Sequence, residues 1–214
     1  LINGDKEIIQ WSERTGWAHL YRYNSDGELL GAITEGQWHV SNVLGVDDAK
    51  RVIYFTATGY NKGEGPYYLH LFRVNYDGTG LKQLDPKDFC GDFSLSDDRR
   101  YFTTTYSRVD AAPVSELYTT DGRRVMTLES VDLEPLFAMG YTYPERFVVK
   151  AADGITDLYG VMYKPYDFDP AKKYPIIEYV YPGPQTEAVE QVWYRPLVRT
   201  DRLAQLGFIV ITVG

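Results

Sequence analysis

The sequence is poor in cysteine, in basic charge and in long apolar runs. Its single cysteine, Cys90, excludes a disulfide within the chain and is most simply a small buried apolar residue. The net charge of −8 argues against nucleic acid as a partner, because binding to phosphates requires a basic face. No apolar run approaches the roughly 18 residues that a membrane-spanning helix needs.

Aromatic side chains, by contrast, are abundant: the 214 residues include 19 tyrosines, 9 phenylalanines and 4 tryptophans. Aromatic residues fit a pleated, half-buried surface, so this composition favours β-sheet. The chain begins at Leu1 rather than at a methionine, and it ends in an apolar run, "LGFIVITVG", that suits the inside of a sheet. We therefore expect the chain to be a piece of a longer protein.

Three segments resemble one another: 19–34, 70–85 and, more weakly, 115–130. Each reads as an alternating strand, a turn centred on Asp-Gly and a second strand. This pattern is a strong signal for a β-hairpin, because the turn needs positive φ angles. A second pair of similar segments, 44–59 and 95–108, places an acidic turn between two short strands.

The two sets of segments interleave with a shared period of about 45 to 50 residues, which is the period of a four-stranded β-propeller blade. An ordinary β-sandwich also contains successive hairpins, but it does not explain two interleaved repeats with one period. About three blades fit into residues 1–135, and a closed propeller needs at least about four. We therefore predict a mostly β fold with an incomplete propeller over residues 1–140, and we expect the missing blades before residue 1.

The pattern changes near residue 140, after which no blade motif occurs. The rest of the chain reads as a hairpin, a loop rich in proline and aspartate, an apolar strand, a short helix and a second apolar strand. These elements are expected at 146–150, 157–163, 165–175, 176–181, 198–206 and 208–213. Strand, helix and strand in this order open an α/β domain, so we place the truncated start of a second domain at 141–214.

One tyrosine, Tyr181, ends the first apolar strand and directly precedes the turn Pro182-Gly183-Pro184. A phenol has a pKa near 10, so it is protonated at neutral pH and can donate a hydrogen bond. From this pattern alone, the ring could close the strand end as a packed aromatic, or its hydroxyl could face the space beyond the turn.

The order of these segments resembles the prolyl oligopeptidase class of serine peptidases, and most closely its dipeptidyl peptidase IV branch. The resemblance covers nearly the whole chain. It rests on "SERTGWAHLYRYN", "ITEGQWHV" and "GYNKGEGPYYLHLFRV" in the blades, and on "KKYPIIEYVYPGPQ" at the first strand of the hydrolase domain. It implies the last blades of a propeller at 1–140 and the first strands of an α/β-hydrolase domain at 141–214.

In this family the tyrosine before x-Gly-Pro supplies one donor of the oxyanion hole, and by position that tyrosine is Tyr181. The nucleophile motif Gly-x-Ser-x-Gly is absent, so the Ser, Asp and His triad is expected beyond residue 214 and the chain alone should be inactive. The glutamate pair that holds the substrate's amino terminus is expected before residue 1. Pro182 and Gln185 depart from the small and polar residues that dipeptidyl peptidase IV has around its Gly-Pro.

For the whole protein, the resemblance implies a serine exopeptidase that releases short peptides after a penultimate proline or alanine, with the propeller as a gate. It implies peptide substrates, no cofactor, a homodimer and a periplasmic or secreted location. Two alternatives stay open. One is a propeller that binds a peptide or protein beside a degenerate hydrolase domain, and the other is a related oligopeptidase or acyl-peptide hydrolase.

The remaining polar residues read as structural. His19 and His70 hold equivalent places in two repeats, and with His39 they have no carboxylate or cysteine at ligand spacing, so no metal site is predicted. The glycine-containing loop 59–70 is longer than a tight turn requires. We expect a plain surface loop there, although it could line the opening between the domains or contact a partner subunit.

Overall fold

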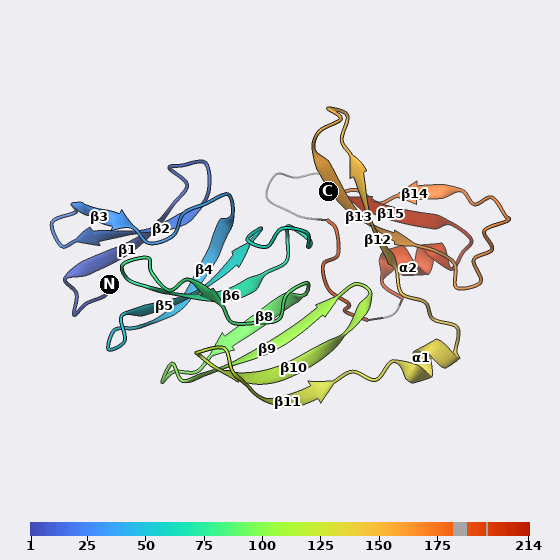
Figure 1. Cartoon of the computed structure of the whole chain (residues 1–214). Coiled ribbons are helices and arrows are strands. Elements are labelled where there is room, and N and C mark those ends of the chain that lie inside the picture. Colours follow the sequence, from blue (N-terminus) through green and yellow to red (C-terminus); the bar gives the residue numbers. More distant parts are fainter. Residues whose placement is uncertain (182–187, 196) are drawn as a thin grey trace. The chain divides into compact units, whose positions relative to one another are not determined.

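The computed structural model describes residues 1–181, 188–195 and 197–214, and within these ranges the chain forms four sheets and two short helices (Figure 1). It divides into two compact units. Leu1–Tyr106 and Ser115–Glu129 form the blade unit, and Ser107–Val114 and Ser130–Gly214 form the C-terminal unit. No helix in the described ranges is both long and apolar enough to cross a membrane. The predicted domain boundary at residue 140 stays a prediction.

The blade sheets are built from strands that follow one another along the chain. The first sheet contains β1 (Glu7–Ser12), β2 (His19–Asn24) and β3 (Leu29–Ala32). The second contains β4 (His39–Asp47), β5 (Val52–Thr58), β6 (His70–Asn75) and β7 (Lys82–Gln83). The third contains β8 (Cys90–Leu95), β9 (Tyr101–Arg108), β10 (Ala111–Thr119) and β11 (Arg124–Ser130). This arrangement confirms the mostly β fold and the predicted partial propeller. The first sheet holds the equivalents of β5 to β7, and no described residue supplies an equivalent of β4.

The Asp-Gly turns occupy the same place in all three sheets. Gly27, Gly78 and Gly122 have φ angles of 84°, 84° and 88°, a region that glycine enters without a steric cost. Each glycine N–H donates to the carbonyl three residues earlier, at distances between 2.8 and 3.1 Å. The turns therefore form as the sequence predicts, and they fix the register of each hairpin.

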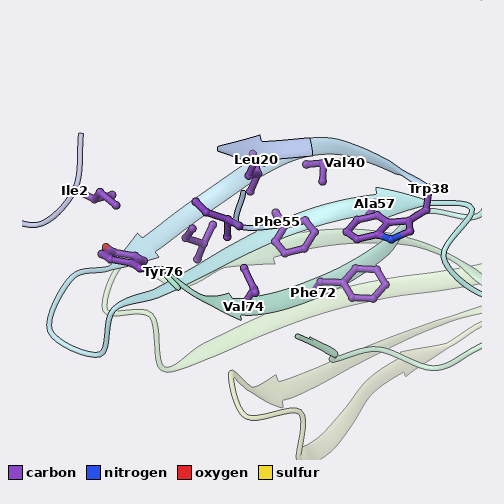
Figure 2. Packing of buried hydrophobic residues seen from close by; sticks show 11 residues of the cluster. Ile2, Leu20, Trp38, Val40, Phe55, Ala57, Phe72, Val74 and Tyr76 are labelled. Atoms are coloured by element: carbon purple, nitrogen blue, oxygen red, sulfur yellow. The ribbon is translucent and has the colours of Figure 1, made fainter. Parts of the chain in front are cut away.

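Two apolar clusters join neighbouring sheets of the blade unit. The first lies between the first and second sheets, where the rings of Trp38, Phe55 and Phe72 stack with centroids 5.6 to 6.2 Å apart (Figure 2). The second joins Tyr54 of the second sheet to Phe102 of the third. Burial of such rings is the dominant favourable term in folding, so the abundant aromatics hold the blades together.

The C-terminal unit contains a four-stranded sheet in the order β12-β13-β15-β14. Its elements are α1 (Glu134–Ala138), β12 (Glu145–Lys150), β13 (Asp157–Tyr163), β14 (Ile176–Glu178), α2 (Arg199–Ala204) and β15 (Ile209–Val213). β14 and β15 are parallel and α2 lies between them in the sequence, as the strand–helix–strand pattern predicts. The helix α2 ends before Gly207, which has a φ of 97°.

The predicted buried strand over 176–181 is shorter and more exposed than expected. β14 ends at Glu178, and the side chains of Ile176 and Val180 are 64% and 58% exposed. In the described chain β14 pairs only with β15, so its other edge has no neighbour and its apolar residues are only partly covered. The helix α1, which begins in an acidic segment and carries Pro135 in its first turn, was not predicted.

Candidate functional site

The predicted hydrogen-bond donor, Tyr181, lies three residues beyond the end of β14. Pairing with β15 extends as far as Tyr179, whose N–H donates to the carbonyl of Ile211 at 2.8 Å. Because side chains alternate along a strand, Ile177 and Tyr179 belong to one face. Both pack against the apolar cluster of the C-terminal unit, whereas Tyr181 is 59% exposed.

The Tyr181 ring is therefore not sealed in the apolar interior. Its hydroxyl forms no hydrogen bond with any residue in the described part of the chain. Pro182, Gly183, Pro184 and Gln185, which continue the motif, lie outside the described residues. The structure thus places the predicted donor at the surface, just after the sheet residues that fix its backbone.

The helix α2 supports the segment that leads to Tyr181. Nη1 of Arg199 donates to the hydroxyl of Tyr179 at 3.3 Å, and the guanidinium lies 5.7 Å from the centre of the Tyr179 ring. This contact joins the first turn of α2 to the residue where pairing with β15 ends. Tyr179 is therefore held both by its backbone and by its ring, two residues before Tyr181.

A buried carboxylate, Asp201, fixes α2 to the loops on either side of it. Its Oδ2 accepts from the hydroxyl of Tyr166 and from the N–H of Leu197, both at 2.7 Å, and its Oδ1 accepts from Nε2 of Gln205 at 3.1 Å. Asp201 is only 5% exposed, so these bonds replace the water that it loses. Burial, followed by the Asp201 carboxylate, raises the pKa of Tyr166, which keeps this phenol a donor.

A small cavity in the C-terminal unit is lined by Tyr141, Tyr163, Trp193 and Asp201, among others. Its volume of about 20 Å³ has room for one water molecule but not for a peptide. Nε1 of Trp193 donates to the hydroxyl of Tyr141 at 2.7 Å, and burial raises the pKa of Tyr141 to about 12.

The blade unit contains a buried charged cluster that the sequence analysis missed. Nε2 of His70 lies 2.7 Å from Oε1 of Glu64, and its Nδ1 lies 2.7 Å from Oδ2 of Asp85. His70 is 1% exposed and the side chains of Glu64 and Asp85 are 8% and 1% exposed. The sequence places no carboxylate at metal-ligand spacing from His70, and the fold brings two carboxyl groups to its ring. Asp85 follows β7 in the same hairpin as His70, whereas Glu64 comes from the loop before β6, whose path the sequence does not reveal.

The cluster is a triplet of titratable groups centred on His70. Burial by itself lowers the pKa of His70, but hydrogen bonds and charge from Asp85 and Glu64 outweigh burial and raise the pKa above its usual value. The two carboxyl groups contact opposite ring nitrogens of His70. Oε2 of Glu64 also accepts from the N–H of Asp88 at 2.7 Å. The triplet thus anchors the loop 59–70 through Glu64, and the expectation of a plain surface loop stays a prediction.

Residues 1–113 match the family model of the dipeptidyl peptidase IV (DPP IV) N-terminal region. Dipeptidyl peptidase 4 of Trichophyton tonsurans is 33% identical over 222 residues, a match that covers 99% of this chain and 28% of that protein. Human dipeptidyl peptidase 8 is 30% identical over 248 residues, covering 97% of this chain and 26% of that protein.

A solved structure shows the same similarity. The crystal structure of Porphyromonas gingivalis dipeptidyl peptidase 4 matches with a TM-score of 0.81 at 25% identity, and the match covers 99% of this chain and 29% of that one. The similarity therefore includes both the blades and the segment that leads to Tyr181. The chain spans only 28% of the length of the T. tonsurans relative.

Proposed function

The chain belongs to the dipeptidyl peptidase IV family, and on that premise we propose that the whole protein is a serine exopeptidase. It removes dipeptides or tripeptides from the amino terminus of peptides, after a penultimate proline or alanine. The observation that carries the proposal is the extent of the match, which covers 99% of the chain in the T. tonsurans relative and includes the blades and the segment around Tyr181. This chain contributes the blades and one donor, and the nucleophile comes from elsewhere in the protein.

In the proposed mechanism, a serine outside this chain attacks the scissile carbonyl, and the hydroxyl of Tyr181 donates to the oxyanion that forms. Such a donor stabilises the transition state more than the substrate, because the oxygen gains charge only as the bond forms. One donor of this kind is worth roughly 3–4 kcal/mol, or about a hundred- to a thousand-fold in rate. The 59% exposure of Tyr181 and the fixed backbone before it support this role, as does the lack of a hydrogen bond from its hydroxyl to any described residue.

The blades have a different proposed task. A propeller beside the catalytic centre admits short peptides and excludes folded proteins, which confines cleavage to peptide substrates. The whole protein is further proposed to be a homodimer in the periplasm or outside the cell, and these proposals rest on the family alone.

Hydrolysis of p-nitroanilide peptides by the whole protein tests this function. We expect release of p-nitroaniline from Ala-Pro-p-nitroanilide and none from its N-acetylated form, because an exopeptidase needs the free amino terminus. Ala-Ala-Pro-p-nitroanilide separates tripeptide release from dipeptide release. Preferred cleavage of the acetylated peptide would instead identify an acyl-peptide hydrolase or an endopeptidase. Peptide binding without any cleavage would identify a binding module.

A further inference from the structure

The groove between the second and third sheets of the blade unit is lined by more basic than acidic residues. It has a volume of about 320 Å³, and its lining includes Lys50, Arg73 and Arg100 but only one acidic residue, Asp121. This excess is notable in a chain whose net charge is −8. The groove lies entirely within the blade unit, because every lining residue belongs to it.

The repeat provides an internal comparison, the space between the first and second sheets. The N–H of Tyr76 donates to the carbonyl of Arg51 at 3.0 Å, and the N–H of Thr120 donates to the carbonyl of Arg100 at 3.1 Å. Each bond joins the residue before an Asp-Gly turn to the residue before a strand. That strand is β5 in the second sheet and β9 in the third. Tyr76 and Arg51 in the second sheet are therefore equivalent to Thr120 and Arg100 in the third.

Between the first and second sheets, the aromatic ring of Tyr76 fills this position. Tyr76 is 2% exposed and packs in the cluster between the first two sheets, at the end where Ile2 lies (Figure 2). Its hydroxyl donates to Oδ1 of Asp48 at 2.6 Å, and the guanidinium of Arg51 lies 5.0 Å from its ring centre. Thr120 places no ring in the second groove. Its hydroxyl donates to a backbone carbonyl, that of Arg99, at 2.8 Å.

The acidic partner of the equivalent arginine also differs. Arg22 faces Ile9 across the first sheet, as Arg73 faces Tyr54 across the second. Nε of Arg22 lies 3.5 Å from Oε2 of Glu7. The residue equivalent to Glu7 is Val52, which is buried and uncharged. Among the described residues, no carboxylate lies within ion-pair distance of Arg73.

The neighbours of Arg73 add to the positive charge. Lys82 lies directly opposite Arg73 in the β6–β7 pair, and like charges in such a position are unfavourable. Lys50 is paired with Asp47 at 2.9 Å. The guanidinium of Arg100 lies 5.5 Å from the ring centre of Tyr101 and forms no ion pair with a described residue. Both guanidinium groups therefore line the groove, and neither has a carboxylate within ion-pair distance in the described ranges.

We propose that this groove binds a small molecule that carries a phosphate or carboxylate group, with the oxyanion between Arg73 and Arg100. Guanidinium groups bind such anions through paired, charge-assisted hydrogen bonds. The ligand occupies the room that the ring of Tyr76 takes up in the preceding space, and its charge replaces that of the missing glutamate.

Titration calorimetry of the whole protein at low salt tests this site, with inorganic phosphate and benzoate as separate probes. We expect saturable binding of at least one probe, and the stronger one identifies the preferred oxyanion. Removal of a charge-assisted hydrogen bond costs about 1.5–3 kcal/mol, so R73Q should weaken binding about ten- to a hundred-fold. R22Q is the matched control in the first space and should leave the affinity unchanged.

Two further variants introduce into the groove the side chains that occupy the equivalent positions between the first and second sheets. T120Y supplies the missing ring, and V52E supplies the missing carboxylate, so each should abolish binding of the stronger probe. R73Q changes a half-buried surface residue, so it keeps the test valid if either copying variant fails to fold. The absence of saturable binding to the wild-type protein would overturn the proposal, and so would equal affinities in wild type and R73Q.

Discussion

The first two blades place a buried histidine at the same position and surround it with different chemistry. In the first blade, Nδ1 of His19 lies 3.0 Å from Oγ1 of Thr34, and its Nε2 lies 2.9 Å from the carbonyl oxygen of Gly36. In the second blade, carboxylates hold both ring nitrogens of His70, each at 2.7 Å. The same fold position is thus filled once with neutral partners and once with ions.

The shared part of the arrangement shows what the blade requires. Oγ1 of Thr34 accepts the N–H of Leu20 at 3.0 Å, and Oδ1 of Asp85 accepts the N–H of Leu71 at 2.8 Å. Either side chain satisfies a buried backbone donor and one ring nitrogen, so the position requires an acceptor and not a charge. The charges in the second blade have an additional consequence, because Glu64 ties the long loop 59–70 to β6.

Substitution of the two histidines by alanine should give the largest difference in folding stability between the two blades. H70A leaves two carboxylates buried without a cation, and removal of one partner of a buried ion pair typically costs about 3–5 kcal/mol. H19A leaves only neutral groups unpaired, at about 1–3 kcal/mol. Denaturant unfolding of the whole protein, followed by hydrogen exchange at β2 and β6, measures both losses. Equal losses in the two variants would contradict the charged state of the second cluster.

The pH dependence of stability should also distinguish the His70 cluster from the neutral surroundings of His19. The folded-state pKa of His70 is raised, so its contribution is fully present below its unfolded pKa of about 6.5 and is lost as pH rises through the folded pKa. The pKa of Asp85 is also raised, because of its burial, but the contribution of Asp85 begins to be lost as pH rises above its ordinary value of 3.8, at more acid pH than that of His70. We expect the melting temperature to fall as pH rises above neutral, and to fall less steeply in H70Q. Identical slopes for wild type and H70Q would rule out this linkage.

The Asp-Gly turns should give the smallest difference between the two blades. Gly27 and Gly78 both have a φ of 84°, so alanine at either position costs about 1–2 kcal/mol of left-handed strain. A Cβ atom at Gly27 meets nothing within 4 Å, whereas at Gly78 it lies 3.0 Å from the carbonyl oxygen of Ile33. Thermal unfolding should therefore show G78A to be less stable than G27A by a further fraction of this amount. A more stable G78A would contradict the close packing of that turn.

Much of the fold was predictable because local signals and the repeat point to one answer. Asp-Gly turns fix the hairpins wherever glycine can adopt positive φ, and apolar alternation then decides which face is buried. The exposure of β14 was not predictable, because it depends on how many neighbours the strand has rather than on its apolar sequence. The short helix α1 has few turns and no buried side chain, so it leaves no periodic signal.

The polar clusters show a second limit on what can be predicted from the sequence. His70 and Asp85 belong to the repeat, so their proximity could have been inferred from the hairpin register. Glu64 could not, because its approach depends on the path of a loop that the first blade does not share. The role of Tyr181 is different again: its position after the strand was read from the motif, and its exposure came only from the structure.

The proposed role of Tyr181 is tested most directly by the turnover of Y181F in the whole protein. The predicted result is a fall in kcat of about a hundred- to a thousand-fold with little change in KM, because the lost bond forms only in the transition state. The melting temperature should not change, since the ring is 59% exposed. Y194F is the matched control, because Tyr194 is 70% exposed in the same unit. Wild-type turnover in Y181F, or an equal loss in Y194F, would contradict an oxyanion-stabilising role for Tyr181.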